Sequence, residues 1–212
     1  MSGNTITICN TAGQALFEAP REEGADLRGA QIGERVGMAV ELAVRQGVSL
    51  SGAMLTGVDL SNRNLTGADL RGAVLSDCNG ERTILEAADL RGSDLRGGYF
   101  HYADFSRALM GGAIANQDTS FYFADFKGAN FQGGISSIGL AWFQDADLRG
   151  ADLRGVELAK NISAMAWVDS TTQMGPVNGI YRGLHICQNK IKQWRQLGSP
   201  QNARHKAKPP QP

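Results

Sequence analysis

The stretch AADLRGSDLRG at residues 87–97 returns almost unchanged as DADLRGADLRG at residues 145–155. Both stretches consist of five-residue units in which Asp, Leu, Arg and Gly follow a small residue. Repetition at a fixed period is typical of repeat architectures, in which each unit buries its inner face only against its neighbours. The five-residue unit therefore sets the register for the rest of the chain.

Large apolar residues recur at this period through most of the chain. They are Leu50, Leu55, Leu60, Leu65, Leu70, Leu75, Leu85, Leu90, Leu95, Phe100, Phe105 and Met110. Gly80 breaks the residue type but keeps the register, which then slips by one residue before Phe121 and by two before Phe143. A small residue stands two positions before most of them, with Arg63 as the main exception. Because a helix needs a period near 3.6 and a strand a period of 2, this period predicts a coil that turns a corner in every unit.

The repeated unit also has a characteristic sequence motif. ADL occurs at residues 68–70, 88–90, 146–148 and 151–153, ADF at 103–105 and 124–126, and ANF at 129–131. This pattern resembles the pentapeptide-repeat family over roughly residues 48–170. The resemblance implies an all-β solenoid, a right-handed quadrilateral β-helix of about six coils stacked at the ~4.8 Å spacing of hydrogen-bonded strands. In that fold Ala and Leu point inward, while Asp, Arg and Gly face solvent or turn the corners.

The flanking segments have the patterns of caps, which a solenoid needs because its bare ends expose unpaired backbone. Residues 1–47 predict a hairpin of strands 5–9 and 14–19 and a capping helix over 34–46. Residues 48–173 form the solenoid. Residues 174–198 predict a short strand and helix, and residues 199–212 a disordered basic tail.

The sequence contains no known catalytic, phosphate-binding or metal-binding motif. We find no Gly-rich phosphate loop, nucleophile elbow or HExxH motif, and the histidines and three cysteines are scattered. We therefore expect no enzyme, no catalytic residue, no metal or cofactor and no small-molecule substrate. No apolar run is long enough for a membrane span, and no signal peptide is evident, so we expect a cytoplasmic protein without membrane contact.

The net charge of zero hides an uneven distribution. Counting Lys and Arg against Asp and Glu, residues 48–173 have 10 and 15, a net charge of 10 − 15 = −5, and residues 174–212 have 7 and none. The basic end raises the possibility of direct nucleic-acid binding, which we do not expect because such tails often serve only solubility.

If every fourth unit shares a face and the slips keep the phase, Phe100, Phe121 and Phe143 form a ladder in the core. Their outward neighbours include Tyr99, Tyr102, Tyr122, Phe123 and Trp142. Exposed aromatic residues on adjacent coils would form an apolar patch of the kind that marks protein-binding surfaces. The alternative is that the C-terminal flank folds back and covers these rings.

Two further faces carry charge. Asp104, Asp125 and Asp147 form a column that either resembles a short line of phosphates or is merely solvated. A third face places Arg71, Arg91 and Arg154 beside Asp69, Asp89 and Asp152, which predicts a self-compensating ladder of exposed ion pairs.

These features favour a non-enzymatic binding protein with a protein partner. The order of hairpin, helix, repeats and basic end resembles short repeat proteins of phages and prophages, which implies an accessory protein that blocks or modulates a host protein. Some members of the family mimic duplex DNA at DNA gyrase, but a solenoid charge of −5 is weak for a mimic. A structural or assembly role, with a homodimer formed through one end, is the third hypothesis.

Overall fold

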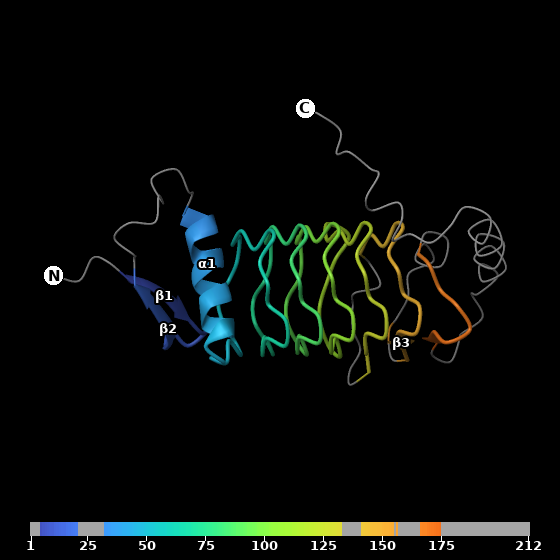
Figure 1. The fold of residues 1–212 in the computed structure, drawn as a ribbon, viewed down its shortest axis with the longest axis horizontal. Helices are drawn as coiled ribbons and strands as arrows, with labels where there is room; N and C mark the ends of the chain where they lie inside the picture. The colour runs from blue at the N-terminus through green and yellow to red at the C-terminus, as the bar shows by residue number, and fades with distance from the viewer. Residues whose placement is uncertain (1–4, 21–31, 133–140, 155, 157–165, 175–212) are drawn as a thin grey trace, which may run out of the picture.

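The computed structural model describes residues 5–20, 32–132, 141–154, 156 and 166–174. A two-stranded hairpin and a helix stand at one end of a row of stacked coils (Figure 1). The elements are β1 (Thr5–Cys9), β2 (Ala15–Pro20), α1 (Ile32–Arg45), β3 (Asp152–Leu153) and β4 (Gln173–Met174). Between α1 and β3 the chain forms coils joined by isolated parallel bridges.

The coils repeat every four pentads. Parallel bridges join Asp69 to Asp89 and Val74 to Asp94, a step of 20 residues. Backbone hydrogen bonds run in both directions between coils: the Leu70 amide donates to the Asp89 carbonyl, and the Asp89 amide donates to the Ala68 carbonyl. Because these ladders pair the backbone of each coil with its neighbours, the predicted repeat solenoid is confirmed.

The core is a stack of the large residues predicted from the register. Leu65, Leu70 and Leu90 are fully buried, as are the small residues that precede them in the inward positions, such as Ala88. The predicted ladder is present, with ring centroids 5.6 Å apart for Phe100 and Phe121 and 4.9 Å apart for Phe121 and Phe143. A second ladder joins Phe105 to Phe126 at 4.8 Å and meets the first edge-on.

Gly80, the interruption in the run of large residues, is explained by its neighbour in the next coil. A Cβ atom at Gly80 would lie 2.3 Å from the Phe100 ring, and one at Gly98 would lie 2.4 Å from the same ring. The two glycines therefore provide the volume that Phe100 fills. A large residue in one coil is balanced by the missing side chain in the coil before it.

The register slips are absorbed without loss of phase. Bridges join Tyr99 to Ser120, a step of 21, and Ser120 to Trp142, a step of 22. The first extra residue lies in a turn closed by Asn116, whose side-chain oxygen accepts hydrogen bonds from the Gly97 and Asp118 amides. Residues 133–140, where the second slip falls, lie outside the described residues.

The N-terminal elements cover the first coil. β1 and β2 pair antiparallel, with a bulge between Ile8 and Cys9. The hairpin end then joins the coil, since the Met54 amide donates to the Cys9 carbonyl at 2.8 Å. These contacts satisfy backbone groups that a bare solenoid end would leave unpaired.

Helix α1 packs its apolar side, which includes the buried Ala39, Val40 and Ala43, against the hairpin and the first coil. It starts two residues before the predicted position and ends in a Schellman motif, in which the Val48 amide donates to the Ala43 carbonyl and Gly47 adopts a φ of 70°.

Arg63, the exception to the rule of small inward residues, is part of the same junction. Its guanidinium lies 3.8 Å from a Glu34 carboxylate oxygen and 3.6 Å from one of Glu41, both on α1. The Asn64 amide also donates to Glu41. Arg63 therefore connects the first coil to the capping helix.

At the other end, β3 and β4 pair in parallel, with Asp152 opposite Gln173. The strand and helix predicted for residues 174–198 and the tail of residues 199–212 lie outside the described residues, apart from Met174. Within the described part of the chain, no helix is long and apolar enough to cross a membrane.

Candidate protein-binding surface

Most described pentads turn their corner at a residue in the left-handed region of φ. Along one edge of the solenoid this residue is glycine in the described coils, at Gly52, Gly72, Gly92 and Gly112, with φ between 63° and 72°. Along the edge that follows the face of Phe100 it is never glycine in the described coils. The residues there are Asn62, Arg82, Tyr102, Phe123 and Asp145, with φ of 59°, 56°, 59°, 57° and 56°.

We call this column of five residues the non-glycine edge. Backbone hydrogen bonds fix its register, because the Tyr102 amide donates to the Tyr122 carbonyl and the Phe123 amide donates to the Gln144 carbonyl. A residue with a Cβ atom in the left-handed region costs roughly 1 kcal/mol relative to glycine. Strain of this kind clusters at functional sites. In this protein it is not confined to one edge, because Asp77, Ala87 and Arg107 also have positive φ.

The aromatic side chains of this region stack on one another across the coils. Tyr102 and Phe123 are parallel within 4°, with ring centroids 5.1 Å apart. Beside them, Tyr99 stacks on His101 at 3.6 Å, and His101 stacks on Tyr122 at 4.8 Å. The result is two short stacks of rings, each joining adjacent coils.

The predicted surface residues are brought together as the register requires. Tyr99, Tyr102, Phe123 and Trp142 are each between 42% and 45% exposed, and Tyr122 is partly buried. Trp142 is held in place by its indole N–H, which donates to the Gln117 carbonyl at 2.7 Å. The flank that was the alternative cover for these rings lies outside the described residues.

The rings of Tyr99 and His101 themselves carry no charge at neutral pH. Burial lowers the pKa of His101, and the Nε2 atom of that ring lies 2.5 Å from the Ser120 hydroxyl oxygen. Burial also raises the pKa of Tyr99. The rings can therefore be covered by a partner without removing a charge from water.

The sequence interpretation missed the corner itself. It placed Tyr102 and Phe123 among the outward neighbours of the ladder, and it left out Arg82 and Asp145, which complete the edge. The signal was present in the sequence, since every fourth pentad lacks the glycine that ends ADLRG units.

The predicted acidic column is present, but most of its charge is compensated. Bridges join Asp104 to Asp125 and Asp125 to Asp147. Asp125 is only 8% exposed and Asp147 only 4%. The Lys127 ammonium lies 2.5 Å from Asp125 and 3.2 Å from Asp147. The Arg149 guanidinium lies 2.6 Å from Asp147.

The cations keep the buried carboxylate ionised. Burial alone would raise the pKa of Asp147, but the hydrogen bond from Arg149 and the charges of Lys127 and Arg149 outweigh it and lower the pKa. The column therefore does not present an exposed line of three negative charges.

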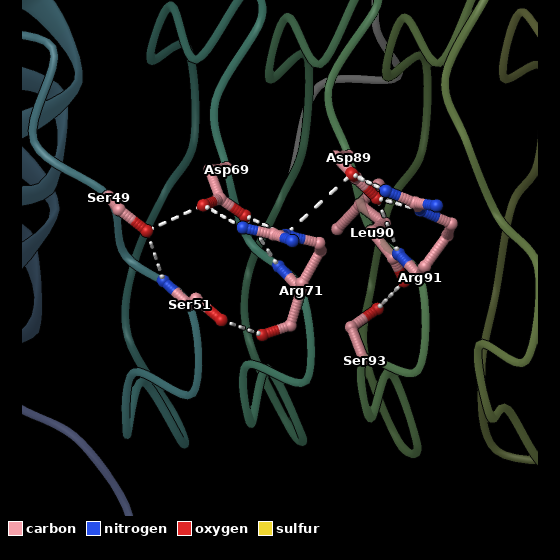
Figure 2. Close-up of polar contacts among 8 residues, drawn as sticks. All are labelled: Ser49, Ser51, Asp69, Arg71, Asp89, Leu90, Arg91 and Ser93. Atoms are coloured by element: carbon pink, nitrogen blue, oxygen red, sulfur yellow. Dashed lines mark hydrogen bonds and ion pairs between the residues drawn. The ribbon is translucent and has the colours of Figure 1, made fainter.

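The mixed face forms the predicted ladder, although the pairs close mainly within one pentad (Figure 2). The Asp69 carboxylate accepts hydrogen bonds from the Arg71 Nε and Nη2 atoms at 2.7 and 2.8 Å, and Asp89 holds Arg91 in the same way. Figure 2 also shows Ser49 donating to Asp69 at 2.6 Å. These pairs are exposed, so each contributes little to stability.

Metal or thiol chemistry finds little support in the described part of the chain. No group of three or more His, Cys, Asp or Glu side chains is arranged there to hold a metal ion. Burial raises the pKa of the Cys78 thiol to about 12, and its Sγ atom donates to the Leu55 carbonyl, so this cysteine behaves as a small core residue.

Comparison with known proteins agrees with the repeat architecture. The model of the family described as pentapeptide repeats matches in eight copies, at residues 46–79, 64–97 and 81–114. A search of curated proteins gives no match.

Solved structures similar to this chain include Rfr23, a pentapeptide repeat protein from the cyanobacterium Cyanothece 51142, with 24% identity and a TM-score of 0.28 over 50% of this chain. The chain spans 63% of the length of Rfr23. A pentapeptide repeat protein from the Arabidopsis thaliana thylakoid lumen has 20% identity and a TM-score of 0.30, covering 62% of this chain and 81% of its own. QnrB1, a plasmid-mediated fluoroquinolone resistance protein, has 16% identity and a TM-score of 0.31, covering 69% of this chain and 83% of its own.

Proposed function

Because its repeats place this chain in the pentapeptide-repeat family, we propose that it is a non-enzymatic binding protein whose aromatic surface contacts another protein. The observation behind this proposal is the non-glycine edge. Tyr102 and Phe123 occupy corner positions where glycine is less strained, yet both rings remain exposed and stacked. Such rings contribute most of the energy in many protein interfaces when a partner buries them.

The proposal includes a cellular role. A solenoid that is capped at its N-terminal end and has exposed aromatic rings on its described coils suits an accessory protein, of the kind found in phages and prophages, that blocks or modulates a host protein in the bacterial cytoplasm. Mimicry of duplex DNA is less favoured, because Lys127 and Arg149 compensate the buried carboxylates of the acidic column.

The test is affinity capture from a bacterial lysate, followed by titration of the captured protein. The double variant Tyr102→Gly with Phe123→Gly should weaken binding by about 30-fold or more, since a central aromatic residue contributes ~2 kcal/mol or more. Its melting temperature should stay equal or rise, because glycine relieves the strain at both corners.

Asn62→Gly provides the matched control. Asn62 lies on the same edge with the same φ but has no ring, so this variant should bind as the unmodified protein does. Equal capture by the double variant would place the functional surface elsewhere. Capture of only a second copy of the chain would favour the assembly role.

A further inference from the structure

The stack of rings on the non-glycine edge has a cation at its first end. The Arg82 guanidinium carbon lies 5.4 Å from the centre of the Tyr102 ring, the geometry of a cation–π contact. Glu81 holds this guanidinium from the side, with 2.5 Å between Nη1 and Oε1. The first end of the stack therefore combines an aromatic face, a guanidinium and a carboxylate, all supplied by the chain.

The second end has two of these three groups. Phe123 stacks on Tyr102 with one face, and no other ring of the described chain stacks in parallel on it. The next residue of the edge is Asp145, in the coil that follows at a spacing of ~4.8 Å. No hydrogen bond or ion pair joins the Asp145 carboxylate to another described residue, in contrast to Asp147, which Arg149 holds at 2.6 Å.

The charges around this end are complementary to a cation. Asp104 lies on the next face of the coil of Tyr102, where it accepts the Ser106 amide but pairs with no cation of the described chain. The one cation on the edge, Arg82, is already compensated by Glu81.

Resting on the proposed function, we propose that the second end of the stack, formed by Phe123 and Asp145, binds an arginine side chain of the protein partner. A guanidinium is flat, so it can stack on the face of Phe123 and donate two hydrogen bonds to the Asp145 carboxylate. The bound group repeats at one end of the stack what Arg82 and Glu81 form at the other. A lysine ammonium has the charge but neither the flat face nor the paired donors.

The test uses a fluorescent nine-residue peptide of Arg and Gly, a peptide of equal charge in which Lys replaces Arg, and a neutral citrulline peptide. Binding to the full chain is measured by fluorescence anisotropy at several salt concentrations. We expect the arginine peptide to bind at least tenfold more tightly than the lysine peptide, and the citrulline peptide to show no binding. Equal affinity for the arginine and lysine peptides would overturn the proposal, because charge alone would then explain binding.

Asp145→Asn should weaken binding of the arginine peptide about tenfold. The matched control is Asp77→Asn, which removes the same charge from a left-handed corner on another edge and should change affinity less than twofold. Equal losses in the two variants would overturn the site. A variant in which Gln replaces Arg182, Arg195 and Arg204 tests whether the chain's own basic end fills the site. If this variant binds the arginine peptide more tightly, the proposal that the arginine comes from a separate partner is wrong, and the basic end is the occupant.

Capture of the partner from lysate by the different variants distinguishes a failure of this proposal from a failure of the proposed function. If Asp145→Asn captures the partner as well as the unmodified protein does, while the double glycine variant does not, the aromatic surface is the binding site but the arginine site is wrong. Loss of capture in both variants, with Asp77→Asn unaffected, supports both proposals.

Discussion

At the scale of the residue, the ADLRG motif forms a turn that is closed by hydrogen bonds between its own Asp and Arg. In each such unit the Asp carboxylate accepts three hydrogen bonds from the Arg two positions later. The donors are the backbone amide, Nε and Nη2, as in the pair of Asp94 and Arg96. The glycine that follows adopts positive φ without strain, as at Gly97. The outward half of the unit thus satisfies its own polar groups, which leaves Ala and Leu free to build the core.

These carboxylates predict a stability that falls in acid. The hydrogen bonds from Arg154 lower the pKa of Asp152 to about 2, and those from Arg71 and Arg91 lower the pKa values of Asp69 and Asp89. An unfolded Asp titrates near 3.9, so below that pH the unfolded chain binds more protons and stability rises with pH. This contribution is present above about pH 4 and is lost as the pH falls towards about 2. Urea midpoints should show a decline in that window, and Asp152→Asn should show a smaller one; a flat profile would contradict the pairing.

Gly80 tests the balance of volumes in the core. Gly80→Leu should lower the free energy of unfolding by about 1–3 kcal/mol, because the new side chain meets the Phe100 ring. Adding Phe100→Leu should restore much of this loss, since the smaller residue vacates the space. Urea unfolding of both single variants and the double variant gives the coupling energy. Additive losses would show that the two positions do not share one volume.

At the scale of the element, α1 is positioned by close backbone contact. A Cβ atom at Gly37 would lie 2.0 Å from the Asp59 carbonyl oxygen, so only glycine allows the helix to approach the first coil this closely. Arg63 and Glu41 then connect the two by an ion pair. The amphipathic pattern of the sequence predicted a helix here but could not show which glycine faces the coil.

Gly37→Ala should therefore separate α1 from the solenoid. We expect a loss of a few kcal/mol, as for other overpacked sites, and faster amide exchange in α1 and the first coil. Gly33→Ala is the control, because its Cβ would lie 3.5 Å from the Asp59 amide nitrogen, an ordinary contact. Alanine is the better helix former, so the control should keep or gain stability. Similar losses in both variants would contradict the docking geometry.

At the scale of the whole molecule, the columns could be predicted because one period fixes every inward position. The phase survives both slips, so Tyr99, Ser120 and Trp142 share a column. Compensation between coils could not be predicted in the same way. Whether Asp147 is exposed depends on Lys127, which lies 20 residues earlier in the chain and reaches the carboxylate only if the slip falls where it does.

The continuous core predicts that the solenoid unfolds as a unit when its centre is disrupted. Leu90 is fully buried, and Leu90→Asp would place a charge inside the stack, where no cation is available to pair with it. Each coil is stabilised only by its neighbours, so the loss should spread to coils on both sides. We expect loss of the circular-dichroism spectrum of the folded protein and of slow amide exchange in coils before and after residue 90. Arg91→Ala, whose side chain is half exposed, should shift the melting temperature little. If the two variants melt alike, the inward and outward assignment is wrong; if protection is lost only near residue 90, the coils on either side are stable independently.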